Sequence, residues 1–374
     1  MNKKEVLEIR RQFTPENCAI TRICGCYVSS EKEKHLEFKE AFLSLPEEET
    51  FKYFDIFKKA LSGTIGKNLI NMEFSLEQEL SGGSQEFLRS LKESKLTDDI
   101  LLEEFYDKAI EYYNFGEQYL ILLIHAVYDI PGKALDGSEM FDASENVYEH
   151  ILCCICPVAL SKAGLCYNPA ANSIQDRIRD WVVGEPANGF LFPAFNDRAP
   201  DIHHLLFYSK KPEALQENFV TSVLGCSEVM SAGSQKESFQ DIIVNTLKED
   251  CDYSVIRTIY ENLNEMIEEA KEEPDPLELG KQEIRKLFIA SGIPEEKLRT
   301  FEEDYNKTIG AHGSLLASNI AETRKFSIET PEAVINVNAE RSDIVNIMEI
   351  SGIKCLVMPI DDELEVNGIL VNAK

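Results

Sequence analysis

The sequence predicts an α+β protein built around a mostly antiparallel sheet with flanking helices. Four apolar runs, separated by Pro, Gly, Asn and Asp, have the composition of buried strands. The runs begin at Tyr119, Val147, Gly189 and Ile202. Beyond Pro212 apolar residues recur at helical spacing, and from Phe326 the period returns to two. Strands followed by helices and then by further strands are typical of an α+β fold.

These changes of period divide the chain into three expected parts. The first is an α+β domain that contains the antiparallel sheet, over residues 1–211. A helical region follows over 212–322, and a small β-rich C-terminal unit covers 323–374. At 374 residues the chain is also too long for one ordinary core.

Ahead of the sheet runs, the sequence predicts a helix, a strand and a second helix. Helical spacing over 6–13 ends at Pro15, and the run from Cys18 alternates as a strand does, which places Cys24 and Cys26 on one face. A helix is expected to start near Ser44, because the glutamates that follow favour the positive end of the helix dipole. Its apolar stripe is predicted to contain Phe51, Phe54, Phe57 and Leu61.

The remaining elements are predicted in the same way. A strand is expected over 69–74, a helix around Phe87 and another over 98–114. The segment before Trp181 is expected to be a short helix or to lead into a strand. In the C-terminal unit, Ser351 and Gly352 lie between two apolar runs, as the turn of a tight hairpin does.

Charge and cysteine content restrict the class of protein. The formal net charge is -28, and all of the excess lies beyond residue 60, because residues 1–60 hold 11 Lys and Arg against 11 Asp and Glu. Such a surface repels phosphate backbones, so binding to nucleic acid is not expected. The N-terminus lacks the apolar core of a signal peptide, and no apolar run reaches the roughly 20 residues of a membrane helix. We expect a cytoplasmic protein with reduced thiols and no membrane association.

The cysteine clusters do not have the spacing of a metal site. Cys24 and Cys26 form one pair, and Cys153, Cys154 and Cys156 form a second group inside an apolar run. Zinc sites usually present C-x-x-C on a tight knuckle. Cysteines within strands usually act as small apolar side chains, so we predict no structural metal and no cofactor.

Histidines in the sheet runs are the best candidates for a functional site. Adjacent strands could bring histidines and carboxylates together as metal ligands or as an acid–base pair. The opposing hypothesis is that these histidines are ordinary polar residues whose hydrogen bonds are satisfied. The loop FNDRAPD from Phe195 is expected to be a turn with a local ion pair. The candidate residues are His125, Asp129, His150, Asp197, Arg198, His203 and His204, with Glu149 and Asp201 nearby.

Five segments resemble a known family. They are TRICGCYV at Thr21, FKYFDIFKKALSGTIGKNL at Phe51, DRIRDWVVGEPANGFLFPAFNDRAPDIHHLLFYSK at Asp176, ENLNEMIEEAKEEPDPL at Glu261 and SLLASNIAETRKF at Ser314. The resemblance is to a family of uncharacterised cytoplasmic bacterial proteins, chiefly from Gram-positive anaerobes, that is known as a domain of unknown function. It covers nearly the whole chain and implies no catalytic residue, ligand or partner.

Three functions from different classes remain open, and the first is favoured. The chain is a protein-interaction or regulatory module without a recognisable catalytic site, a metal-assisted hydrolase with a site on the histidine-bearing sheet, or a nucleic-acid or ribosome-associated factor. The last would use Arg177, Arg179 and Arg198. For the first, a basic protein partner is expected at the acidic helices, since 259–304 hold 14 Asp and Glu against 6 Lys and Arg.

Overall fold

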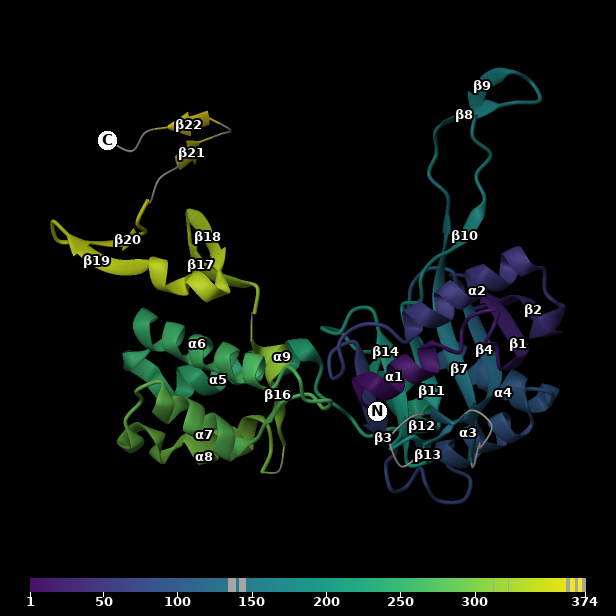
Figure 1. Ribbon diagram of the computed structural model, residues 1–374, viewed down its shortest axis with the longest axis horizontal. Helices are drawn as coiled ribbons and strands as arrows, with labels where there is room; N and C mark the ends of the chain where they lie inside the picture. The colour runs from purple at the N-terminus through teal and green to yellow at the C-terminus, as the bar shows by residue number, and fades with distance from the viewer. Residues whose placement is uncertain are drawn as a thin grey trace. The chain divides into compact units, whose positions relative to one another are not determined.

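A computed structural model describes residues 1–133, 139–140, 146–311, 313–321, 323–360, 364–366 and 369–371. The chain divides into two compact units, Met1–Gly233 (unit 1) and Ser234–Lys374 (unit 2). The three-part division expected from the sequence stays a prediction. Figure 1 shows unit 1 in purple to teal and unit 2 in green to yellow.

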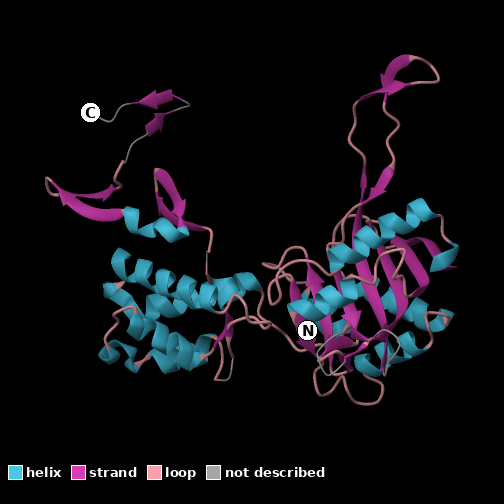
Figure 2. Ribbon diagram, in the orientation of Figure 1, coloured by secondary structure: helices cyan, strands magenta, loops and turns pink. Residues whose placement is uncertain are grey.

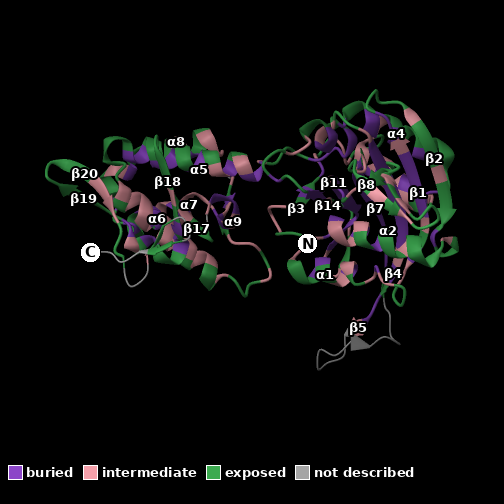
Figure 3. Ribbon diagram, turned by 90° about the horizontal axis from the view of Figure 1, so that it is seen from above, coloured by how far each residue is buried: buried purple, intermediate pink, exposed green. Residues whose placement is uncertain are grey.

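Unit 1 is built on one antiparallel sheet. In spatial order its strands are β2 (Lys34–Ala41), β1 (Ile20–Val28), β4 (Tyr119–Ile130), β7 (Asn146–Leu160), β11 (Asn188–Phe192), β14 (His204–Ser209) and β3 (Leu69–Glu73). All neighbouring pairs on this path are antiparallel. The α+β fold with a mostly antiparallel sheet is therefore confirmed, and the central strands are the most buried ones (Figure 3).

Helices cover both faces of this sheet (Figure 2). One face, called here the α3/α4 face, packs against α3 (Ser84–Glu93), α4 (Asp99–Tyr112) and the π-helical turn η2 (Phe219–Val223). The other, the α1/α2 face, packs against α1 (Lys3–Arg10), the short turn η1 (Phe42–Ser44) and α2 (Glu47–Ala60). Each layer buries its own apolar cluster, so side chains of one strand contribute alternately to two cores.

Local sequence accounts for the helix starts. Asn2 and Glu5 form a capping box at α1, and the Asp98 side chain accepts from the amides of Ile100 and Leu101 at α4. At α2 the prediction was partly wrong. The helix begins at Glu47 after Pro46, without a side-chain cap, and Phe51 is exposed because it lies on the outer side of the first turns.

Unit 1 also has small hairpins at the ends of the large strands. The pairs are β5 (Gly132–Lys133) with β6 (Glu139–Met140), β8 (Leu165–Asn168) with β9 (Ser173–Asp176), and β12 (Ala194–Asn196) with β13 (Ala199–Asp201). A further strand, β10 (Trp181–Val183), pairs with the end of β7. The segment before Trp181 thus leads into a strand, one of the two outcomes expected for it.

Unit 2 starts with helices joined by aromatic contacts. They are α5 (Ala232–Leu247), η3 (Lys248–Asp250), α6 (Tyr253–Glu269), α7 (Lys281–Ala290), η4 (Glu295–Arg299), α8 (Phe301–Thr308) and α9 (Ala317–Ile320), with the strand pair β15 (Glu278–Leu279) and β16 (Leu315–Leu316). The ring of Phe288 in α7 lies 6.4 Å from Phe239 in α5 and 5.6 Å from Phe301 in α8. The core of unit 2 therefore lies between these helices.

Three hairpins and a 3-10 segment complete unit 2. They are β17 (Lys325–Thr330) with β18 (Ala333–Asn338), η5 (Ala339–Ile344), β19 (Asn346–Ile350) with β20 (Ile353–Val357), and β21 (Leu364–Val366) with β22 (Ile369–Val371). The predicted tight turn is confirmed, since Ser351 and Gly352 connect β19 to β20 with φ of 54° and 81°. Among the residues described here, these hairpins do not join into one sheet.

Candidate functional site

The structure separates the histidines of the sheet. Across β4 and β7, His125 is opposite Ile151, and Ala126 is opposite His150. Residues directly opposite share a face and successive residues alternate, so His125 projects to the α3/α4 face and His150 to the α1/α2 face. These two histidines therefore do not form one site.

His125 has a partner at each ring nitrogen. Its side chain is buried, its Nδ1 lies 2.6 Å from Thr21 Oγ1 of β1, and its Nε2 lies 2.8 Å from Glu149 Oε1 of β7. Burial lowers the pKa of His125 below its ordinary value, although the Glu149 carboxylate acts in the opposite direction. A neutral imidazole between a hydroxyl and a carboxylate can accept a proton.

His150 is enclosed in the core of the α1/α2 face. Its ring stacks on Tyr148 with centroids 4.5 Å apart, and Nε2 is buried without a hydrogen-bond partner among the described residues. Burial lowers the pKa of His150 to about 3. This histidine is therefore neutral at physiological pH. It is also closed off from solvent, so no substrate can reach it.

The other two histidines each have a local carboxylate. His203 is exposed, and its Nδ1 lies 2.7 Å from Glu79 Oε1, a hydrogen bond that raises the pKa of His203. His204 Nδ1 lies 2.8 Å from Asp201 Oδ2. Both are pairs of a histidine with one carboxylate, an ordinary surface arrangement.

The loop candidates have structural roles. Asp197 and Arg198 form the two-residue turn between β12 and β13, with φ of 51° and 56°. Arg198 also forms an ion pair with a residue far away in sequence, since its Nη2 lies 2.9 Å from Glu8 Oε1 of α1. Asp129 is exposed and lies four residues beyond His125 on the same face, which places it about 13 Å further along the strand.

The clustered cysteines of β1 and β7 lie in the two cores of unit 1. Cys24, Cys26 and Cys153 belong to the α3/α4 face, whereas Cys154 and Cys156 belong to the α1/α2 face. Burial raises the pKa of Cys24 to about 11 and that of Cys26 to about 12, so both thiols are protonated and unreactive. In the part of the chain that the structure describes, no group of three or more His, Cys, Asp or Glu could hold a metal ion. The absence of a structural metal stays a prediction.

A groove between α2 and β10 was not predicted from the sequence. It is a cavity of about 630 Å³ on the α1/α2 side of unit 1. Its apolar lining comes from Tyr53, Ile56, Leu120, Trp181, Val182 and Val183, and its polar lining from Glu49, Lys52, Asp55, Lys59 and Glu185. Trp181 and Val182 keep 54% and 51% of their surface exposed, which is unusual for residues of a strand beside a helix. The only sequence feature that could have indicated this groove is Trp181, the single tryptophan of the chain.

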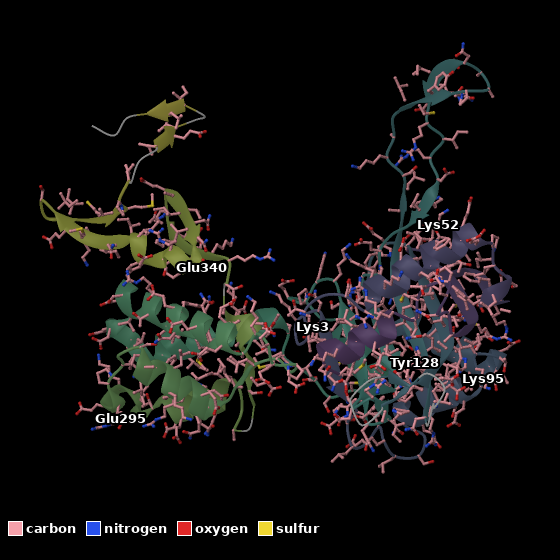
Figure 4. The ribbon with its side chains drawn as sticks, in the orientation of Figure 1. Lys3, Lys52, Lys95, Tyr128, Glu295 and Glu340 are labelled. Atoms are coloured by element: carbon pink, nitrogen blue, oxygen red, sulfur yellow. The ribbon has the colours of Figure 1, made fainter. Side chains whose placement is uncertain are left out.

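Unit 2 has a smaller, acidic cavity of about 400 Å³ between α6 and η5. Five carboxylates line it, from Glu261, Glu265, Glu268, Glu340 and Asp343; Glu340 is labelled in Figure 4. The apolar side of α6 faces the core of unit 2, with Ile259 and Leu263 fully buried. Glu261 is half-buried, and its carboxylate accepts a hydrogen bond of 2.6 Å from Ser342.

Comparison with known proteins identifies the family. Among the described helices, none has the length and apolar character to span a membrane. No curated protein matches the chain. A family model described as Domain of unknown function (DUF4317) matches residues 1–369, nearly the full length, and its description names no activity. The chain therefore belongs to the family described as Domain of unknown function (DUF4317).

Proposed function

We propose that the protein is an interaction module that binds an extended, apolar segment of a partner protein in the groove between α2 and β10. The observation that supports this function most strongly is the exposure of Trp181 and Val182 in a cavity of about 630 Å³. Aromatic and aliphatic side chains in a concave site are the usual anchors of peptide recognition. The bacterial, cytoplasmic setting that the family resemblance implies is part of this proposal.

The free edge of β10 favours a segment in extended conformation. Ser161 donates to the Asp180 carbonyl and Gly184 donates to the Pro157 carbonyl, so residues 180 and 184 are oriented toward β7. Backbone groups alternate along a strand, so the amide and carbonyl groups of Trp181 and Val183 point away from β7. Within the described chain, no strand pairs with that outer edge. A partner segment can therefore add there as another strand.

Charges close one end of the groove. Glu185 lies 3.3 Å from Lys59 and 3.1 Å from Lys210, measured between side-chain oxygen and nitrogen. Together with Glu49, Asp55 and Lys52 of the lining, this cluster comprises three carboxylates and three ammonium groups, so the groove offers no strong net charge to a ligand. The partner segment is accordingly expected to be apolar and uncharged, with alternate side chains facing Trp181 and Val183.

The fluorescence of Trp181 provides a direct test. Extended peptides of about nine residues, selected from a displayed random library, are titrated into the full-length protein. We expect a blue shift of the emission, because the bound peptide removes the indole from water. Val183→Pro deletes one outward amide and should weaken binding about fivefold, since one hydrogen bond contributes roughly 1 kcal/mol.

The matched control is Ile178→Ser, which alters an exposed apolar residue outside the cavity lining. This variant should bind as the wild type does. The proposal is wrong if selection yields no peptide that shifts the emission, or if Val183→Pro and Ile178→Ser reduce affinity equally.

A basic protein partner at the acidic cavity of unit 2 is a second candidate. The specific observation is the convergence of five carboxylates from α6 and η5 on one cavity. Opposite charge would set the rate of association and the choice of partner more than the affinity. The ligand class is a Lys- and Arg-rich segment, because each cation can meet a separate carboxylate.

Charge reversal distinguishes this cavity from the overall charge of the protein. Changing Glu265, Glu268, Glu269 and Glu272 to Lys should abolish binding of a Lys- and Arg-rich probe peptide and of any partner recovered from native cells. The control changes Glu302, Glu329, Glu332 and Glu349 to Lys, which alters the net charge equally at exposed positions elsewhere in unit 2. Equal loss in both variants would mean that only net charge matters, and this candidate would be discarded.

A further inference from the structure

A hydroxyl, an imidazole and a carboxylate form a continuous chain at the α3/α4 face. Thr21 Oγ1 lies 2.6 Å from His125 Nδ1, and His125 Nε2 lies 2.8 Å from Glu149 Oε1. The two outer residues reach the surface, since Thr21 is exposed and Glu149 keeps 30% of its side chain exposed, whereas the imidazole between them is fully buried. The buried imidazole is thus hydrogen-bonded on each side to a group that solvent can reach.

A break in strand register places Thr21 in this position. The β1–β4 register shifts between Ile20 and Arg22, so Thr21 is the extra residue of a bulge. Bulges direct a side chain out of the regular alternation and are over-represented next to active sites. Here the bulge turns the Thr21 hydroxyl toward His125, within 3.2 Å of the His125 carbonyl as well.

The partners of His125 determine its tautomer. An ionised carboxylate only accepts hydrogen bonds, so the Nε2 proton of His125 is donated to Glu149. Nδ1 then has a lone pair, and the Thr21 hydroxyl donates to it. These are the roles of the nucleophile, base and orienting carboxylate in hydroxyl-dependent acyl transfer.

Two cations lie beside this chain. Lys92 in α3 and Lys95 in the turn that follows both act electrostatically on His125; Lys95 is labelled in Figure 4 and is exposed. Neither lysine forms an ion pair with any residue within the described ranges. Their positive charges therefore favour a substrate that carries an anionic group near His125.

We propose that Thr21, His125 and Glu149 form an acyl-transfer site for small esters that bear an anionic group, with Thr21 as nucleophile. His125 Nδ1 takes the Thr21 proton as Oγ1 attacks the ester carbonyl. The bond to the leaving alcohol breaks, and the alcohol leaves with the proton from His125. Water then attacks the Thr21 ester with His125 as base, which releases the acid and restores the hydroxyl. Glu149 is a positioning residue. This site is independent of the groove between α2 and β10.

The test uses the full-length protein with p-nitrophenyl hemisuccinate and with the neutral p-nitrophenyl butyrate. We expect a burst of p-nitrophenol and a succinyl mass on the peptide that contains Thr21. Thr21→Val keeps the shape and β-branching of the side chain, so it should fold normally and lose the adduct, whereas Thr21→Ser should retain it. Thr330→Val, in a hairpin of unit 2, is the control and should label as the wild type does.

Two further variants examine the roles of charge and position. Lys95→Ala should slow the reaction of the hemisuccinate several-fold more than that of the butyrate. Glu149→Gln should slow acylation about tenfold or more, because a neutral amide does not stabilise the imidazolium that forms when His125 takes the Thr21 proton. In the wild type, acylation should fall as the pH drops through the pKa of His125, which lies below its ordinary value of 6.5. Glu149→Gln should move that midpoint lower, since the carboxylate stabilises the imidazolium.

The outcomes are decisive in both directions. A succinyl group on Thr21 that disappears in Thr21→Val supports the site. Labelling of lysines alone, or equal burst amplitudes in the wild type and Thr21→Val, overturns it. A Thr21 adduct whose rate does not depend on Glu149 or on pH would also overturn it, because His125 would then not act as the base.

Discussion

The two faces of the sheet in unit 1 hold the same residue type in opposite circumstances. On the α3/α4 face, His125 has a hydrogen-bond partner at each nitrogen and is connected to solvent through Thr21 and Glu149. On the α1/α2 face, His150 stacks on Tyr148 and has a buried nitrogen without a partner in the described structure. Burial alone therefore does not indicate function. The partners decide whether a buried histidine can exchange a proton or only reduces stability.

The largest expected effect is on the acid stability of the α1/α2 face. Because the pKa of His150 is lowered to about 3 in the folded state, the unfolded chain binds a proton that the folded chain does not as the pH falls below about 6.5. The wild type therefore loses stability as the pH falls, and His150→Phe should not. The free energy of unfolding of the variant relative to the wild type should rise by about 3 kcal/mol from roughly pH 7 to pH 4. Urea unfolding at both pH values measures it. A constant difference would show that His150 is protonated in the folded protein.

Tyrosine hydroxyls provide a second comparison of the two faces. On the α1/α2 face, Tyr148 donates a hydrogen bond of 2.6 Å to the Pro193 carbonyl. On the α3/α4 face, the Tyr106 hydroxyl is buried and has no partner in the described residues. Tyr148→Phe should cost about 1–2 kcal/mol, whereas Tyr106→Phe should be neutral or slightly stabilising. Denaturant unfolding of the two variants gives the values, and equal costs would contradict this assignment of partners.

The smallest effect concerns the carboxylate of the α3/α4 face. Glu149→Gln keeps an oxygen that can accept from His125 but removes the charge. Because Glu149 is about a third exposed, solvent screens much of the interaction, and we expect a loss of about 1 kcal/mol at neutral pH. Thermal unfolding measures it. A loss well above about 2 kcal/mol, more than is expected for Tyr148→Phe, would mean that Glu149 is needed mainly for stability.

Much of this sheet could be predicted from sequence because its strands are long and apolar on both sides. The runs from Tyr119 and Val147 face a core on each side, so nearly every residue is apolar, and turn residues mark their ends. The strand β2 could not be predicted in this way. It is an exposed edge strand. Its sequence, KHLEFKEA, is mostly polar because the strand faces solvent and not a core.

The candidate site depended on information that is not local. The sequence places His125, Glu149 and His150 in neighbouring strands. The strand register, in which His125 is opposite Ile151, determines which of these side chains share a face of the sheet. A shift by one residue would exchange the faces. Thr21 was also beyond prediction, since only the bulge in β1 turns it toward His125. The groove beside Trp181 depends on the packing of a helix from one part of the chain against a strand from another.

The position of β3 at the edge of the sheet bears on how the protein is made. This strand is synthesised early, but it pairs with β14, and the neighbouring Asn68 side chain binds the Ser209 carbonyl across 141 positions of sequence. While the ribosome is still adding the intervening residues, β3 has no strand to join. Completion of the sheet must therefore wait until residue 209 has left the exit tunnel, and the nascent chain exposes apolar strands for that interval. This order of strands lengthens the interval in which the nascent chain is open to aggregation.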